Sequence, residues 1–187
     1  IAYFAGRAMV AHGFIGASTV AMLSFIAAPM YVAGALLSHH ARIGGVAIES
    51  AGYVAGLRSL LWGVVLFVPL GLANAADGSP GADISWVTEW WLPAWLPWFS
   101  GIAEEIWFRL LLVSLATILL TPAVRGRRGA ASMIAALFSG LVFGLGHGRD
   151  LEHLLVTGLL YGLPFGAVFA RRDWEHAVGA HYVVNAI

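Results

Sequence analysis

The sequence predicts an all-α fold, a polytopic transmembrane helical bundle with about six spans in this fragment. Three observations predict it. Sixty per cent of the 187 residues are hydrophobic, and the mean hydropathy is +0.83. Only 11% are charged, whereas about a quarter of a soluble domain is charged. Several apolar runs approach the roughly 20 residues that a membrane-spanning helix needs, and helices satisfy their own backbone hydrogen bonds in lipid.

The first half of the chain contains two predicted spans. Residues 13–37 carry no charge and are long enough to cross a membrane at a tilt. A semi-polar stretch with Glu49 and Arg58 follows, and it leads to the second span at about 60–76. Pro69 lies within this second span, where we expect a kink that membrane helices tolerate.

The connection at 77–98 is the longest in the chain, and it is rich in tryptophan. It opens with the turn-rich stretch DGSPGAD. Tryptophan favours the membrane interface, so we interpret the connection as an amphipathic segment on the membrane surface. The alternative is an aromatic lip of a substrate-binding site. The connection holds five of the eight tryptophans: Trp86, Trp90, Trp91, Trp95 and Trp98.

Four further spans are predicted in the second half. Pro97 suits the start of a helix, so we expect the third span at 97–120. The fourth is expected at 130–147, the fifth at 153–170, and a sixth from about Trp174. Glycines recur every four residues in the fourth and fifth spans, which predicts close helix packing. They are Gly140 and Gly144, then Gly158, Gly162 and Gly166.

The arginines predict how the bundle is oriented. If six spans alternate, most arginines lie on one side, and the acidic connection at 77–97 lies on the other. Basic residues favour the cytoplasmic side, so the arginine-rich side should be cytoplasmic. The arginines on that side are Arg42, Arg58, Arg125, Arg127, Arg128, Arg171 and Arg172.

Composition and missing motifs exclude several classes of function. Cysteine is absent, which excludes disulfides, thiolate metal sites and a cysteine nucleophile. The formal net charge is zero, so no overall basic field suggests nucleic acid as a partner. The serine-hydrolase patterns GxSxG and SxxK and the zinc-protease pattern HExxH do not occur.

Charged residues interrupt the third span in the stretch GIAEEIWFRLLL, residues 101–112. Charges inside a membrane helix are costly and usually functional. Glu105 and Arg109 are four residues apart, so they should form an ion pair. Glu104 lies about 100° further round the helix and needs another partner or a proton. A desolvated glutamate is a candidate general base; the alternative is that all three residues form a structural ion cluster.

Two histidines and an asparagine extend this set. His147 ends the fourth span, with Phe143 four residues earlier on the same face, and His181 and Asn185 share a face of the sixth. With Glu104, these residues supply a base, a second base or water-orienting group, and two oxyanion donors. Alternatively, each histidine is a satisfied interfacial residue, as we expect for the other histidines: His12, His39, His40, His153 and His176.

Three of these stretches together resemble a known membrane family. EEIWFR matches the EExxxR motif of the CAAX-protease and bacteriocin-processing family (Abi, or CPBP), FGLGH matches its FxxxH motif, and HYVVN matches its HxxxN motif. The motifs occur in the family's order, and the resemblance covers about residues 97–187. It implies a catalytic helical core at 97–187, preceded at 1–96 by N-terminal spans and the interfacial segment. Leu110 stands where most members have glycine.

The resemblance implies an intramembrane endopeptidase of the prokaryotic plasma membrane. Glu104 and His147 would activate water, and His181 and Asn185 would stabilise the oxyanion. Glu105, Arg109 and Phe143 would support them. The expected partners are the lipid bilayer and a peptide or protein substrate, with or without a lipid group. No cofactor and no nucleic acid are expected.

Other functions remain open at this stage. A zinc hydrolase would use Glu104, His147 and His181 as ligands. An ion-coupled transporter also needs charges in the membrane, and a non-catalytic immunity or binding protein would keep the fold. At 1.5 Å per residue, Glu104, His147 and His181 are expected about 10, 5 and 18 Å below the outer face. Tilt, kinks or a longer third helix must therefore bring them together.

Overall fold

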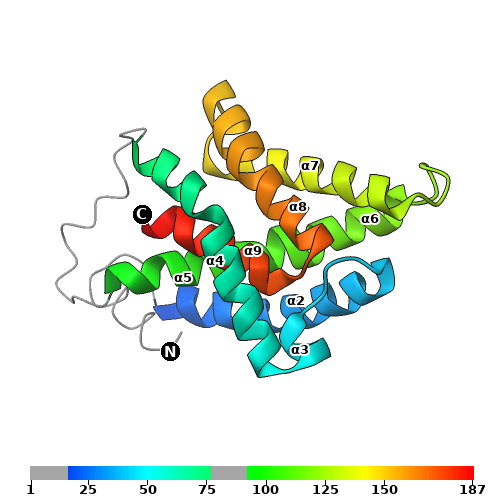
Figure 1. Cartoon of the computed structure of the whole chain (residues 1–187), viewed down its shortest axis with the longest axis horizontal. Helices are drawn as coiled ribbons and strands as arrows, with labels where there is room; N and C mark the ends of the chain where they lie inside the picture. The colour runs from blue at the N-terminus through cyan, green and yellow to red at the C-terminus, as the bar shows by residue number, and fades with distance from the viewer. Residues whose placement is uncertain (1–16, 77–91) are drawn as a thin grey trace.

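The computed structural model describes residues 17–76 and 92–187, and the side chains of residues 26–76 and 97–187. Every regular element in these ranges is a helix, which confirms the predicted fold class (Figure 1). The N-terminal part contains α2 (Ala17–Ala41), the short α3 (Ala47–Ala51) and α4 (Tyr53–Ala76).

The C-terminal part is built from two composite helices, one uninterrupted long helix between them and one short helix at the end. The first runs through α5 (Leu92–Glu105), the π-helix η1 (Ile106–Val113) and α6 (Ser114–Leu120). After α7 (Arg128–His147), the π-helix η2 (His153–Gly162) continues into α8 (Leu163–Arg171). The last helix, α9 (Trp174–Ala186), carries the third sequence motif.

Two predicted boundaries are wrong. The third span was expected to begin at Pro97, but α5 begins at Leu92 and Pro97 lies inside it. A proline inside a helix removes one backbone hydrogen bond and bends the helix without having to begin it. Pro93 supplies a helix-start signal four residues before Pro97. The second span was expected from residue 60, but α4 begins at Tyr53 because Arg58 lies on its exposed side.

Three helices in the described ranges are long and apolar enough to cross a membrane: Tyr53–Ala76, Arg128–His147 and His153–Arg171. They correspond to the predicted second, fourth and fifth spans. The predicted third span carries three charges close together, at 104, 105 and 109, and the sixth, α9, has 13 residues. The count of about six spans therefore stays a prediction.

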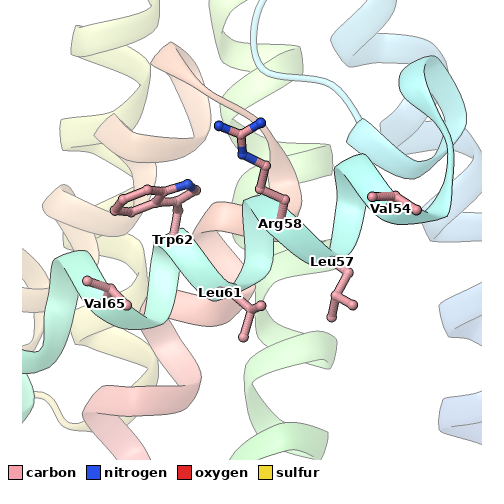
Figure 2. A pocket seen from close by; sticks show the side chains of 6 residues that line it. All are labelled: Val54, Leu57, Arg58, Leu61, Trp62 and Val65. Carbon is pink, nitrogen blue, oxygen red and sulfur yellow. The ribbon is translucent and has the colours of Figure 1, made fainter.

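The α4 helix has two different faces. One face exposes apolar side chains, as expected of a helix that faces lipid; six of its residues line a shallow pocket of about 430 Å³ (Figure 2). The other face packs against α9, which it crosses in Figure 1. A Cβ added at Gly63 would collide with the backbone carbonyl of His176. The pocket residues are Val54, Leu57, Arg58, Leu61, Trp62 and Val65.

Glycines also bring α7 and η2 into backbone contact, as their spacing predicted. A Cβ at Gly140 would lie 2.7 Å from the carbonyl oxygen of Gly158, and one at Gly162 would lie 2.9 Å from the Cα of Gly140. Only glycine allows this approach. The contact places the Gly162 carbonyl inside the bundle, next to Arg109 of η1.

Most of the tryptophan-rich connection lies outside the described residues, so neither interpretation of it is tested. The exception is Trp98, whose ring lies 4.9 Å from that of Tyr182, centroid to centroid. This contact joins α5 to α9. The two helices that carry Glu104 and His181 are therefore packed against each other close to those residues.

Candidate active site

The two adjacent glutamates at the end of α5 lie in different environments. Glu105 is fully buried, whereas 29% of the Glu104 side chain is exposed. This difference follows from the rotation of about 100° per residue in a helix. The predicted Glu105–Arg109 ion pair is confirmed, with 3.1 Å between Glu105 Oε2 and Arg109 Nε. Both of its side chains are completely buried.

Arg109 is enclosed by aromatic rings and by the end of η2. Its guanidinium carbon lies 4.8 Å from the ring centroid of Phe143 and 5.4 Å from that of Phe165, distances typical of cation–π contacts. Its Nη2 donates a hydrogen bond of 3.1 Å to the Gly162 carbonyl. A buried cation needs such partners. Arg109 therefore fixes Glu105 to the packed core.

Glu105 uses its other oxygen to hold His181. The distance from His181 Nδ1 to Glu105 Oε1 is 2.8 Å, and only 2% of the His181 side chain is exposed. The ring stacks on Phe165, with 4.8 Å between centroids and 18° between planes. Because an ionised carboxylate only accepts hydrogen bonds, Nδ1 is the donor. The Nε2 atom of His181 then faces Glu104, 3.6 Å from Oε2.

His147 reaches the same oxygen from the end of α7. Its Nδ1 lies 2.8 Å from the Phe143 carbonyl oxygen, which can only accept, so Nδ1 carries the proton. Its Nε2 lies 3.8 Å from Glu104 Oε2. In a neutral imidazole with this tautomer, Nε2 is the acceptor nitrogen. About 40% of the His147 side chain is exposed, so this part of the site is open to the surroundings.

Glu104, His147 and His181 therefore converge. The Nε2 atoms of both histidines point to Glu104 Oε2 at distances of 3.8 and 3.6 Å. These separations are too long for direct hydrogen bonds, but a water molecule can bridge groups at such distances. Glu104 Oε2 is also buried and has no hydrogen-bond partner within the protein. Buried polar atoms are normally paired, so this oxygen is available to a water or to substrate.

The early start of α5 removes the expected difference in depth between Glu104 and His181. Glu104 lies twelve residues after Leu92, which is about 18 Å along the helix at 1.5 Å per residue. This is the depth expected for His181. A longer third helix, one of the explanations considered, therefore accounts for the level of Glu104 relative to His181 but not for that of His147.

Asn185 lies one helical turn beyond His181, and the structure does not join it to the other three residues. Its side chain is exposed, and Nδ2 donates a hydrogen bond of 3.3 Å to Ser100 Oγ. Ser100 lies four residues before Glu104, so the two helices are linked at successive turns. Sequence reasoning missed Ser100, although its spacing from Glu104 was a usable signal. It also missed Phe165, which no feature distinguishes from other core aromatics.

Interfacial roles were expected for five other histidines, and His176 contradicts this. It is 9% exposed, and its Nδ1 lies 2.8 Å from Asp173 Oδ1 at the start of α9. It is part of a helix cap. His153 lies on the surface, and its backbone N–H and ring hold the pKa of Asp150 below its usual range. His39 and His40 are exposed, and His12 lies outside the described residues.

The zinc alternative requires Glu104, His147 and His181 to act as ligands. Zinc binds such ligands at about 2.0–2.2 Å in a tetrahedral arrangement. Within residues 26–76 and 97–187, no group of three His, Asp or Glu side chains is placed to hold a metal ion. Zinc dependence is therefore a question for chelation experiments.

The fold and these side chains define a class: a helical membrane protein with a buried charged centre beside a partly exposed carboxylate and an exposed imidazole. A family model described as Type II CAAX prenyl endopeptidase Rce1-like matches residues 86–187, more than half of the chain. The chain belongs to this family of membrane proteases. No curated protein and no solved structure matches the chain significantly.

Proposed function

We propose that this protein is a CAAX-protease-like membrane endopeptidase that hydrolyses a peptide bond with a water activated by Glu104 and His147. One observation carries the proposal. The unpartnered Oε2 of Glu104 lies 3.6–3.8 Å from the Nε2 atoms of two histidines. A water between them would have a carboxylate to take its proton and an imidazole to orient it.

The two histidines take different parts in this mechanism. His147 donates from Nδ1 to a neutral carbonyl, so its neutral form offers Nε2 as an acceptor to the water. His181 donates from Nδ1 to the Glu105 carboxylate. In its cationic form, an imidazole carries a proton on both ring nitrogens, and Nε2 is then a donor as well. His181 would therefore stabilise the oxyanion, and the amide of Asn185 would assist after leaving Ser100.

The proposed reaction balances without a cofactor. The water oxygen bonds to the carbonyl carbon of the substrate while Glu104 accepts a proton from the water. The tetrahedral intermediate then loses its C–N bond as Glu104 returns the proton to the leaving amine. The products are a carboxylic acid and an amine. Glu105 and Arg109 hold His181 in position throughout and do not exchange protons with the substrate.

The remaining parts of the proposal concern location and substrate. We propose a multi-pass protein of a prokaryotic plasma membrane, with its catalytic core at 97–187 and N-terminal spans at 1–96. Its substrate is a peptide or protein at the membrane surface. The family description favours a prenylated peptide over an unmodified one. A free nucleic acid is not an expected partner.

Cleavage by the purified chain in liposomes tests the proposal. Quenched fluorescent CAAX-type peptides, one farnesylated and one unmodified, are the probes. We expect wild-type cleavage of at least one peptide, and we expect Glu104→Gln to lower kcat about 10²–10⁴-fold, as loss of a general base does. Undiminished cleavage by Glu104→Gln would overturn the role of Glu104.

A chelator separates this mechanism from the zinc alternative. We expect 1,10-phenanthroline to leave the cleavage rate unchanged. Loss of cleavage that added zinc restores would instead favour a metal hydrolase with Glu104, His147 and His181 as ligands. Solute flux into the liposomes without cleavage of either peptide would favour a transporter.

A further inference from the structure

The first turn of α9 contains a buried carboxylate that the proposed chemistry does not use. Glu175 is 2% exposed. Its Oε2 accepts a hydrogen bond of 2.8 Å from the backbone N–H of Ala47, and its Oε1 accepts one of 2.8 Å from Ile48. Ala47 and Ile48 are the first two residues of α3, and they lie outside the segment that matches the family.

The charge of Glu175 is balanced by backbone dipoles. Among the described side chains, no Arg or His forms an ion pair with it. Hydrogen bonds from two backbone N–H groups to a carboxylate are charge-assisted and strong. They also lie at the positive end of a helix. The contact therefore requires both oxygens of a carboxylate at this position, and an amide cannot replace it in full.

Two neighbouring contacts fasten the same turn of α9 to the N-terminal part of the chain. The backbone N–H of Trp174 donates a hydrogen bond of 2.8 Å to the Gly45 carbonyl. Asp173 caps α9 through the His176 N–H, and it accepts a bond of 3.0 Å from the Ser59 hydroxyl of α4. The start of α9 is thus held by both α4 and the segment before α3.

The middle of α9 is packed between α4 on one side and α5 on the other. A Cβ at Gly179 would collide with the Leu60 carbonyl of α4. His181, two residues further on, faces the opposite neighbour and reaches Glu105 and Glu104. It lies six residues after Glu175, which is about 9 Å along the helix. Any slide or rotation of α9 at its first turn would therefore move the His181 ring.

We propose that Glu175 is a positioning residue for His181. It fixes the height and rotation of α9 against α3 and α4, so that His181 Nε2 stays 3.6 Å from Glu104 Oε2. This inference rests on the proposed function. A misplacement of about 1 Å in an active site can lower the rate about 100-fold. The N-terminal part of the chain then contributes to catalysis through α9, although its residues do not touch the reacting atoms.

The test compares Glu175→Gln with Glu152→Gln, which changes an exposed carboxylate directly before η2. In Glu175→Gln, the amide nitrogen would face a backbone N–H, donor against donor. We expect kcat per folded molecule for the fluorescent peptide to fall about 10–100-fold with KM changed little. The unfolding temperature should fall as well, because buried N–H groups lose their acceptor. The Glu152→Gln control should keep the wild-type kcat. A purely structural role predicts a lower unfolding temperature and an unchanged kcat per folded molecule, which would overturn the inference.

Two further variants decide the remaining cases. Glu175→Asp keeps the charge but shortens the side chain, and we expect a kcat between those of wild type and Glu175→Gln. If Glu175→Gln does not fold, Glu175→Asp decides: a lower kcat at unchanged KM supports positioning, and a wild-type kcat overturns it. If Glu104→Gln is inactive while Glu175→Gln has wild-type kcat, only the positioning role fails. If Glu104→Gln is fully active, the proposed function itself fails.

Discussion

The two halves of the candidate site differ in how firmly the protein holds them. Arg109, Glu105 and His181 are at most 2% exposed and form a connected chain of short contacts. Glu104 and His147 are 29% and 40% exposed and lie 3.8 Å apart. The buried half is built into the core, whereas the open half is partly exposed and within reach of water and substrate. Because the two halves differ in this way, we expect mutations to separate effects on stability from effects on catalysis.

The largest expected effect is a loss of stability on removing Arg109, the cation of the buried half. Arg109→Leu would leave Glu105 as an uncompensated buried charge, so we expect about 3–5 kcal/mol of destabilisation. Thermal unfolding of the purified protein in detergent measures it. Arg149→Leu removes an exposed arginine beyond α7 and should change stability little. Equal stability of the two variants would show that the buried chain is not structural.

The two histidines provide the sharpest comparison between the halves. We expect His147→Ala and His181→Ala each to abolish cleavage. Only His181→Ala should also destabilise the fold, by about 1–3 kcal/mol, because it leaves a Glu105 oxygen without its donor. Peptide cleavage and thermal unfolding on the same samples measure both effects. A similar loss of stability in both variants would contradict the division.

Sequence patterns predicted the contacts within one helix, in both halves of the site, better than the contacts that support the buried half from other helices. The spacing of Glu105 and Arg109 predicted their pair, and the position of Glu104 on the helix showed that it needed another partner. Spacing along one helix carries such information because both residues share one backbone. The contact of Glu175 with Ala47 crosses 128 residues, and no local pattern encodes it. The π-helical form of η1 and the position of Phe165 depend in the same way on tertiary packing.

A smaller effect should follow from changing Phe165, the aromatic ring that contacts His181 and Arg109 in the buried half. Phe165 stacks on His181 and lies beneath the Arg109 guanidinium. In Phe165→Leu we expect a loss of about 1–3 kcal/mol, from the stacking and cation–π contacts together, with kcat reduced but not abolished. Phe138→Leu, at a half-exposed ring on α7, is the matched control. Full activity and stability in Phe165→Leu would mean that the Phe165 ring does not orient His181.

The smallest expected effect is a change in stability at a residue outside both halves of the site. Arg42 follows the end of α2 with φ of +53°, and Arg125 follows α6 with φ of +56°. Glycine has no steric penalty in this left-handed region. We therefore expect Arg42→Gly to stabilise the protein by up to about 1 kcal/mol. The control Arg127→Gly, at a φ of −76°, should give no gain; a gain there would mean that lost charge, rather than relieved strain, is responsible.

The proposed mechanism places a water between Glu104 Oε2 and the Nε2 atoms of His147 and His181. High-resolution density for the protein in lipid tests it most directly. We expect one water within about 2.7–3.2 Å of all three atoms. A peak about 2.0–2.2 Å from them would be a metal ion. Direct closure of either histidine onto Glu104, with no water between them, would also contradict the claim.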